Sequence, residues 1–271
     1  MGHLKHFVSK IFPRHSEYTL QKMRKDYLDL LMKVLCGVIY KDSGQMKGEI
    51  TPYNEQIRQG GWDWPTHAHT MIGYQRLSNV CKLMEKILKE NTPGDVIETG
   101  VWRGGASIMM RAVLYAYGVR NRKVYVADSF EGLPAPNSEA YPADANSDFH
   151  EFPELAVSLE EVRNNFKVYG LLDDQVVFVK GWFKDTLPTL RVNSFALIRL
   201  DGDMYESTMD ALVNLYDKLS PNGYVIIDDY HVVQACKDAV HDFCESRQLS
   251  PEMKEIDGVG IYWKKTNNIS S

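Results

Sequence analysis

Residues 95–107 read DVIETGVWRGGAS, and this stretch predicts the fold because it passes from a strand into a helix through glycines. The segment DVIET (95–99) has the length of a buried strand, and GGASIMMRAVLYAYG (104–118) predicts a helix that ends at Gly118. A second strand, KVYVADS (123–129), follows. A strand, a helix and another strand in this order predict a parallel sheet covered on both faces by helices.

The same alternation continues along the chain. We expect helices at 158–170, 205–219 and 231–248, a short helix near 183–187, and strands at 175–181, 195–201 and 223–229. The extended runs EMKEID and VGIYWKK are joined through Asp257 and Gly258, which predicts an antiparallel hairpin. An α/β fold with a mostly parallel seven-stranded sheet and a C-terminal antiparallel hairpin resembles the Rossmann-like fold of class I methyltransferases.

The region before residue 91 has a different texture. Apolar residues recur at helical spacing over 16–40, polar and glycine-containing sequence predicts a loop over 41–66, and a second helix is expected over 66–90. We therefore expect an N-terminal helical extension at 1–90, which caps the site and serves dimerisation, before a catalytic domain at 91–271. The apolar stripe of the first helix suits a dimer contact or packing on its own domain.

A long segment rich in proline, serine and acidic residues covers about 131–156. It is long for a connection in a compact domain, and such loops often close over active sites. We expect a lid at about 132–153; the alternative is a disordered surface insertion.

Composition limits the classes of function. The chain has 271 residues, 44% of them apolar, and a net charge of -5, which argues against a nucleic-acid-binding protein. No run approaches the roughly twenty apolar residues of a membrane span. The four cysteines show neither CxxC spacing nor the density of a disulfide framework. We expect a soluble, cytoplasmic protein without a nucleic-acid or membrane partner.

The first strand-to-helix turn has the character of a cofactor site. Glu98 stands two residues before Gly100, and Trp102 replaces the second glycine of the dinucleotide fingerprint G-x-G-x-x-G. Asp128 ends the second strand, where an acidic residue binds ribose hydroxyls in nucleotide folds. These features favour an adenosine-bearing cofactor. The alternatives are a purely structural glycine turn and an Asp128 that binds only its own backbone.

Carboxylates also follow two later strands. Asp201 and Asp203 come after the fourth strand, and Asp228 and Asp229 after the fifth. Asp203 alone is explained by capping of the helix that begins near Tyr205. Capping does not account for the others, and both strands are expected beside the first strand, so that their ends face one crevice. Clustered oxygens favour a hard cation such as Mg²⁺.

Histidines offer a weaker metal site. His67 and His69 are two residues apart on an expected helix, so they point to different faces and suit zinc poorly. We expect local or substrate contacts for them, and a solvated helix start for His231.

At this point several motifs together resemble the macrocin O-methyltransferase (TylF/MycF) family over about residues 50–263. They are HTMIGYQRL, PGDVIETGVWRGGASI, ADSFEGLP, AVSLEEVRNNF, YGLLDDQVVFVKGWFKDTLP, LIRLDGDMYESTMDAL and VIIDDY. The resemblance implies S-adenosylmethionine and Mg²⁺ as cofactors, a sugar hydroxyl of a glycosylated small molecule as acceptor, and a homodimer. It implies metal ligands at Asp201, Asp228 and Asp229. It implies cofactor contacts at Thr70, Met71, Glu98, Thr99, Gly100, Val101, Arg103, Gly104, Ser107, Asp128, Ser129, Gly181, Trp182, Phe183 and Asp201.

The catalytic base is a hypothesis from the residues. Related catechol methyltransferases use a lysine three residues after the first metal aspartate, and here that residue is Met204. We therefore expect Asp203 to act as general base, with Asp201 as the fallback. Candidate substrate contacts are Tyr53, Trp64, His67, Tyr141, His150 and Tyr230.

Three rival functions remain. A metal-dependent catechol or phenol O-methyltransferase is disfavoured by Met204. A binding module that has lost its chemistry is disfavoured by the retained aspartates. A nicotinamide-dependent oxidoreductase is disfavoured by Trp102 and the C-terminal hairpin.

Overall fold

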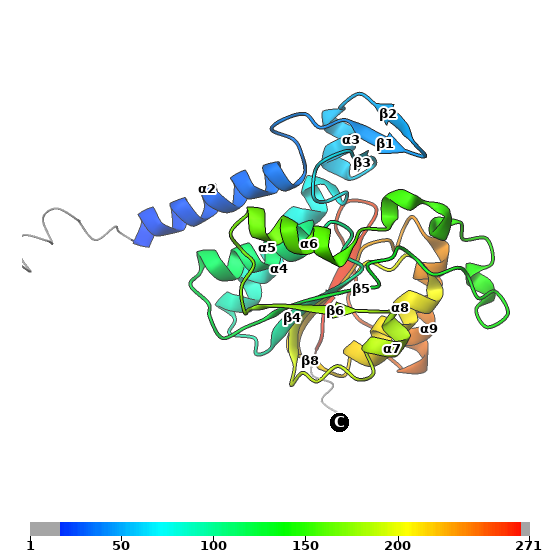
Figure 1. Cartoon of the computed structure of the whole chain (residues 1–271). Helices are drawn as coiled ribbons and strands as arrows, with labels where there is room; N and C mark the ends of the chain where they lie inside the picture. Colours follow the sequence, from blue (N-terminus) through cyan, green and yellow to red (C-terminus); the bar gives the residue numbers. More distant parts are fainter. Residues whose placement is uncertain (1–16, 267–271) are drawn as a thin grey trace, which may run out of the picture.

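The computed structural model describes residues 17–266, in two sheets and the helices around them (Figure 1). The main sheet has seven strands in the order β6-β5-β4-β7-β8-β10-β9. Pairs from β6 through β8 are parallel, and β10 is antiparallel to both β8 and β9. Its strands are β4 (Asp95–Thr99), β5 (Val124–Asp128), β6 (Val176–Lys180), β7 (Phe195–Leu200), β8 (Leu219–Ile227), β9 (Lys254–Glu255) and β10 (Ile261–Lys264). The predicted α/β fold with its closing hairpin is confirmed.

Helices cover both faces of the main sheet (Figure 1). Alternate residues of each strand enter opposite cores, because successive side chains of a strand point to opposite faces. Val96 belongs to the core beneath one helical layer and Ile97 to the other. The first layer comprises α2 (Glu17–Leu35), α4 (Gly73–Lys89), α5 (Gly105–Ala116) and α6 (Leu159–Val168). The second comprises α7 (Phe183–Thr186), α8 (Tyr205–Leu215) and α9 (Gln234–Ser246).

Strand order brings the carboxylate-bearing segments together. β7 lies directly beside β4, and β8 lies one strand further along rather than beside β4. The fifth strand is therefore not a direct neighbour of the first, although its carboxyl end still reaches the same edge.

The expectation of a plain loop over 41–66 was wrong. That segment forms a three-stranded antiparallel sheet with a short helix. Its elements are β1 (Gly44–Met46), β2 (Glu49–Thr51), α3 (Glu55–Gly60) and β3 (Trp64–Pro65). Very short strands leave almost no alternating pattern in the sequence, and this explains the miss.

The two N-terminal helices are also shorter than expected. The first ends at Leu35, followed by Gly37 at φ +69°, and its expected first residue, Ser16, lies outside the described residues. The second begins at Gly73 instead of Thr66. Asp42 accounts for the delay, because its carboxylate accepts hydrogen bonds from the Thr66 hydroxyl (2.5 Å) and the amides of residues 67 and 68 (2.8 and 2.7 Å).

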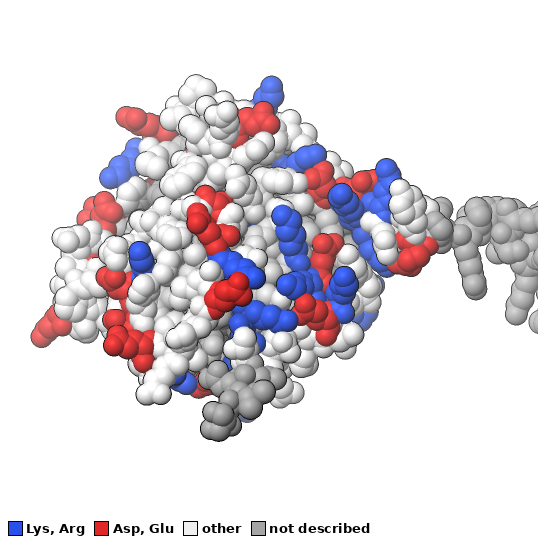
Figure 2. Space-filling model, turned by 180° about the vertical axis from the view of Figure 1, so that it is seen from behind, with Lys and Arg blue, Asp and Glu red and all other residues white. Residues whose placement is uncertain are grey.

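The segment expected as a lid contains three short 3-10 helices, η1 (Pro142–Asp144), η2 (Phe149–Glu151) and η3 (Pro153–Leu155). Among residues 17–266, no helix is both long and apolar enough to cross a membrane. On the face shown in Figure 2, acidic side chains lie among the basic ones, so the surface there has mixed charge.

Candidate active site

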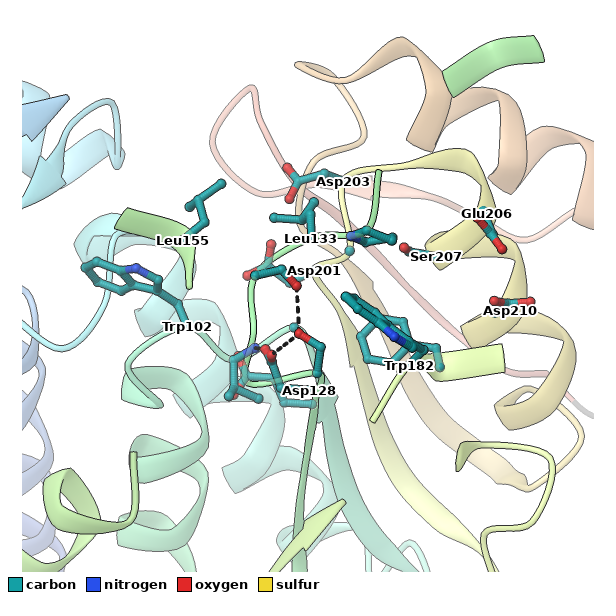
Figure 3. A pocket seen from close by; sticks show the side chains of 18 of the residues that line it. Trp102, Asp128, Leu133, Leu155, Trp182, Asp201, Asp203, Glu206, Ser207 and Asp210 are labelled. Carbon is teal, nitrogen blue, oxygen red and sulfur yellow. Dashed lines mark hydrogen bonds between the residues drawn. The ribbon is translucent and has the colours of Figure 1, made fainter. Parts of the chain in front are cut away.

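A cavity of about 310 Å³ opens at the carboxyl ends of β4, β5, β6 and β7. Figure 3 shows Trp102 and Trp182 on opposite sides of it, with Asp201 between them. Backbone and apolar groups make much of the wall, and carboxylates lie at the strand ends. Its lining residues are Thr70, Met71, Ile72, Glu98, Gly100, Val101, Trp102, Ala106, Asp128, Ser129, Gly132, Leu133, Pro134, Ala135, Leu155, Gly181, Trp182, Phe183, Lys184, Asp201, Gly202, Asp203, Glu206, Ser207 and Asp210.

Gly100 is required by the close approach of two chain segments at the edge of the cavity. Its φ is +79°, and a Cβ there would lie 1.6 Å from the Asp201 carbonyl oxygen. Any other residue would force the end of β4 away from the segment that carries Asp201. The glycine turn therefore has a structural cause, and it also borders the cavity; cofactor contact at this turn stays a prediction.

Trp102 occupies the position at which the dinucleotide fingerprint has a glycine. Its φ is +47°, a left-handed conformation that is unusual for a large residue. The indole Nε1 donates to the Glu154 carbonyl oxygen at 2.8 Å, so the ring lines the cavity and also holds the end of the long loop. Sequence reasoning used Trp102 only to exclude a dinucleotide site and missed this role.

Glu98 is buried at the end of β4. One carboxylate oxygen accepts from Arg199 Nη1 at 2.5 Å and the other from the Ser107 hydroxyl. Burial raises the pKa of Glu98 to about 7, against the opposing charge of Arg199. Ser107 supports this carboxylate from beneath and does not border the cavity.

Asp128, at the end of β5, borders the cavity but is bonded to its own turn. Its Oδ2 accepts from the Val101 amide at 2.8 Å and its Oδ1 from the Phe130 amide at 2.7 Å. Burial raises the pKa of Asp128, and these amide bonds oppose the rise. Asp128 therefore binds backbone amides of the neighbouring turns, one of the two roles that the sequence left open. Ribose binding by Asp128 stays a prediction.

Three aspartates meet at the ends of β7 and β8. One carboxylate oxygen each from Asp201, Asp203 and Asp229 lies within 4.8 Å of the other two. Asp201 also accepts from Arg199 Nη1 at 2.8 Å. Within residues 17–266 no protein group donates a hydrogen bond to Asp203, and Oδ2 of Asp229 is buried without a partner.

The charges of this cluster are incompletely neutralised. Burial raises the pKa of Asp203 to about 8, and the neighbouring Asp201 and Asp228 add to the rise. The pKa values of Asp201 and Asp229 are raised by the same two causes, burial and nearby carboxylates. Buried carboxylates of like charge without enough donors are a suitable environment for a cation.

Asp228 lies next to this group but is held differently. Its Oδ1 accepts from Arg199 Nη2 at 2.5 Å, and its Oδ2 accepts from Arg76 Nη1. Arg76 also reaches Asp257 Oδ2 at 3.2 Å and the Gly61 carbonyl oxygen at 3.1 Å. The ligand set predicted from the sequence contained Asp228; the geometry instead brings Asp203 together with Asp201 and Asp229.

Capping by Asp203, the alternative drawn from the sequence, does not occur. Met204 occupies the N-cap position of α8 and makes no side-chain capping bond. Asp144, from the long loop, accepts from the amides of Tyr205 (2.7 Å) and Glu206 (3.0 Å) in its place. Asp203 instead adopts φ +56° and borders the cavity.

Eleven of the fifteen residues predicted to contact the cofactor line the cavity, namely Thr70, Met71, Glu98, Gly100, Val101, Asp128, Ser129, Gly181, Trp182, Phe183 and Asp201. The other four do not. Thr99 and Ser107 are buried behind the wall, Gly104 is the N-cap residue of α5, and Arg103 donates to the carbonyl oxygens of residues 65 and 68.

Sequence reasoning expected a lid over about 132–153 but named none of its wall residues 132–135, and Leu155 lies just beyond those bounds. It missed the α8 face formed by Glu206, Ser207 and Asp210, as well as Ile72, Ala106, Lys184 and Gly202. The spacing of Glu206 and Asp210, four residues apart on an expected helix, would have indicated that both lie on one face. The loop residues carry no comparable signal, because their placement depends on tertiary contacts.

The six candidate substrate residues do not line this cavity. Trp64 packs edge-on against Phe152, and Tyr53 faces the Arg58 guanidinium. His67 donates its amide to Asp42, and His150 lies in η2. Tyr141 lines a second cavity between the loop, α8 and α9, while the Tyr230 hydroxyl bonds His241 Nε2 at 2.6 Å. Their contact with an acceptor stays a prediction.

The histidine pair forms no metal site of its own. His69 Nδ1 lies 2.7 Å from the Tyr169 hydroxyl, and burial lowers the pKa of His69. His231 donates its amide to the Val259 carbonyl oxygen at 2.9 Å.

Comparisons with known proteins agree with this architecture. The sequence model of the macrocin-O-methyltransferase (TylF) family matches residues 24–265. Demethyldecarbamoylnovobiocin O-methyltransferase of Streptomyces niveus is 49% identical over 244 residues, covering 89% of this chain and 93% of the relative. Mycinamicin III 3''-O-methyltransferase of Micromonospora griseorubida is 48% identical over 245 residues, with coverages of 89% and 96%.

A third relative, from Streptomyces olivaceus, methylates the 4' position of 8-demethyl-8-(2,3-dimethoxy-alpha-L-rhamnosyl)-tetracenomycin C and is 50% identical over 250 residues, covering 89% of this chain and 92% of its own length. The solved structure of the O-methyltransferase NovP superposes with a TM-score of 0.87 at 49% identity, covering 90% of this chain and all (100%) of that one. The calicheamicin methyltransferase CalS11, at 18% identity and a TM-score of 0.58, covers 94% of this chain and 95% of its own and shares the fold.

Proposed function

This chain belongs to the macrocin O-methyltransferase family, and from that premise we propose that it methylates a sugar hydroxyl of a glycosylated small molecule, with S-adenosylmethionine and Mg²⁺. That it is an O-methyltransferase follows from its relatives. The acceptor class is carried over from their substrates, among them a rhamnosyl tetracenomycin. The lining of the cavity supports S-adenosylmethionine, and the aspartates at the strand ends support Mg²⁺.

The cavity suits a cofactor with one polar and one aromatic part. Apolar and aromatic groups such as Leu133, Trp182 and Phe183 lie on its wall, together with the carboxylates at the strand ends. A sulfonium is cationic, and a cavity bordered by Glu98 and Asp201 favours positive charge. The residues that would hold S-adenosylmethionine are the eleven predicted ones that line the cavity, together with Trp102 and the 132–135 segment.

The buried Oδ2 of Asp229, which has no donor among residues 17–266, is the observation that carries the metal proposal. An unpartnered buried carboxylate oxygen is costly unless a ligand satisfies it. Asp201 and Asp203 bring further oxygens within 4.8 Å. An all-oxygen set of this kind fits Mg²⁺, which keeps positions open for the acceptor.

The third metal ligand has two candidates. Asp228, predicted from the sequence, is bonded to two arginines, but a carboxylate has about four acceptor positions and can add a cation. Asp203 has no donor within the described part of the chain and already lies with Asp201 and Asp229. We propose Asp201, Asp228 and Asp229 as ligands, which leaves Asp203 free as the general base.

When bound, S-adenosylmethionine supplies an electrophilic methyl group and Mg²⁺ lowers the pKa of an acceptor hydroxyl. Asp203 then accepts the proton of that hydroxyl on a carboxylate oxygen. Arg199, bonded to Glu98 and Asp201, fixes the orientation of the strand-end carboxylates. Leu133 and Leu155 of the long loop cover the cavity and exclude water from the reacting groups.

A phenol acceptor is the alternative that the sequence left open. Met204, at the position of the lysine base in catechol enzymes, is buried and has no titratable group. This favours a sugar acceptor over a catechol.

Calorimetry tests the proposal directly. We expect wild-type protein to bind S-adenosylmethionine and, separately, Mg²⁺, and Asp229→Asn to bind only the former. Asp148→Asn, an exposed aspartate of the long loop, is the control and should bind both. Wild-type protein that bound no S-adenosylmethionine would contradict the proposal.

The homodimer and the cytoplasmic location are part of the same proposal. Helix α2 packs on its own domain through Leu31 and Leu35, while Met23 and Leu30, seven residues apart and so on one face of the helix, are more than half exposed, at 55% each. That apolar strip suits a second copy of the chain. Sedimentation of wild-type and Met23→Glu/Leu30→Glu protein should show a dimer only in the former.

A further inference from the structure

Helix α8 begins directly after residues 201–204, which carry Asp201 and Asp203. No side chain of these four residues caps the helix. Met204 at the N-cap position has no polar side chain. The first two amides of the helix donate to the carboxylate of Asp144, which is 61 residues earlier in the sequence and 1% exposed. A carboxylate at this end of a helix also meets the positive end of the helix dipole.

The position of Asp203 depends on this cap. Residues 201–204 form the whole link between β7 and α8. Its first end is fixed to the sheet, because the Asp201 amide donates to the Thr99 carbonyl oxygen at 2.9 Å. Its other end is the first turn of α8, which Asp144 holds. Asp203, at φ +56° between these ends, has no side-chain bond of its own to a protein group of the described chain.

Asp144 also belongs to the long loop, 132–155, whose ends line the cavity. Segment 133–135 and Leu155 of that loop line the wall. The loop is held at its start by the bond from the Ser129 hydroxyl to the Gly132 carbonyl oxygen (2.6 Å) and near its end by Trp102. The contact of Asp144 with α8 lies between these two attachment points in the sequence. It joins the long loop to the helix that follows residues 201–204.

We propose that Asp144 is a positioning residue that couples closure of the loop over the cavity to the placement of Asp203. With the loop on the cavity, the first turn of α8 is capped and Asp203 is held at the strand end. When the loop lifts, Tyr205 and Glu206 lose their acceptor and Asp203 is released. The base is then in place only while the cavity is covered, and a ligand that holds the loop down also orders the base.

The role of Asp203 in this proposal rests on the proposed function, but the coupling rests on contacts of the chain alone. Amide hydrogen exchange of the protein without acceptor therefore tests it independently of turnover. In Asp144→Ala, the amides of residues 205 and 206 should exchange about tenfold faster, the effect expected for a lost cap. Exchange over 133–155 should rise in the same variant.

Two variants sharpen the test. Asp144→Asn keeps one acceptor oxygen and should give an intermediate exchange rate, even where the alanine variant proves too unstable to measure. Asp148→Ala removes a 58% exposed aspartate of the same loop and should leave residues 205 and 206 unchanged. Faster exchange at α8 in Asp148→Ala, or unchanged exchange there in Asp144→Asn, would overturn the coupling.

Turnover provides the second readout. We expect kcat to fall about tenfold in Asp144→Ala and to recover partly in Asp144→Asn, because capping strength sets the fraction of enzyme with Asp203 in place. Mg²⁺ affinity should change little in both. If no variant and no wild type transferred a methyl group, the proposed function would fail while the exchange result stood.

Discussion

The carboxylates at the sheet edge fall into two groups that differ in how the protein satisfies them. Glu98, Asp128 and Asp228 each have both oxygens bonded to arginines, amides or hydroxyls of the chain. At the same edge, the half-buried Asp203 accepts no side-chain hydrogen bond from residues 17–266, and Oδ2 of Asp229 is buried without a partner among them. Asp228 and Asp229 are adjacent and both buried, so burial alone does not distinguish the two groups; the supply of hydrogen-bond donors does.

The difference indicates what each group is for. A carboxylate whose oxygens are all bonded holds neighbouring elements, and Asp228 does so while keeping acceptor positions for a cation. The buried Oδ2 of Asp229 lacks a donor among the described residues and stays costly until a ligand arrives, so it marks where a ligand belongs. Substitutions of Glu98 and of Asp229 should therefore have opposite effects on the stability of the protein without Mg²⁺.

The largest effect is expected at Asp229. Asp229→Asn should lower kcat by about 10³-fold, because a bound metal contributes several kcal/mol to the transition state. The same change should raise the melting temperature of the metal-free protein, because it removes an uncompensated buried carboxyl. Turnover and thermal unfolding without Mg²⁺ check both. A lower melting temperature would break the distinction between the groups.

Asp203→Asn should lower kcat by about 10²-fold, the contribution of a general base. Mg²⁺ affinity should be preserved if Asp203 is the base and Asp228 the third ligand. Parallel measurements of kcat and of Mg²⁺ binding by calorimetry decide this. Loss of metal binding would show that Asp203 is the ligand instead, and near-normal turnover would leave Asp201 as the base.

Glu98→Gln represents the bonded group. It removes one of the three carboxylates around the buried Arg199, so we expect a loss of roughly 2 kcal/mol in the free energy of unfolding. Mg²⁺ binding should remain. Urea unfolding measures the expected loss of stability, and a Mg²⁺ titration of the same protein measures metal binding. Weakened metal binding together with wild-type stability would contradict the prediction.

The smallest effect is a dependence of stability on pH. The pKa of Asp203 is raised from 3.8 to about 8 in the folded protein, so the folded form keeps a proton that the unfolded form has lost. Stability of the metal-free protein should therefore fall as pH rises from about 4 to about 8. In Asp203→Asn we expect that fall to be smaller by roughly 2–4 °C in melting temperature. An identical slope in both proteins would argue against the raised pKa.

The sequence predicted the main sheet well because its signals are local. Apolar strands such as 195–200, helical spacing in α4 to α9 and the turn at Asp257 and Gly258 each lie within one short window. The N-terminal sheet was missed because two- and three-residue strands leave no such window. The late start of α4 depends on Asp42, which is 24 residues before Thr66.

The site was predictable in composition but not in bonding. Clustered aspartates after two strands indicated a shared edge, and the shared edge is observed. Nothing in the sequence told Asp228 from Asp229, because Arg76, which bonds only the former, is 152 residues away. The capping role of Asp144 was hidden for the same reason: its partners lie on another element.

The long loop at 132–155 also determines which positions can be changed when the enzyme is engineered. Its wall residues, 133–135 and Leu155, lie in one continuous segment, so a loop from a relative can be exchanged as a cassette to alter acceptor range. The cassette has to retain an aspartate at position 144, which accepts from the amides of α8. It also has to place the backbone carbonyl of residue 154 where Trp102 can donate to it. Libraries that randomise 133–135 and Leu155 change the cavity wall and leave the contacts of Asp144 with α8 and of residue 154 with Trp102 intact.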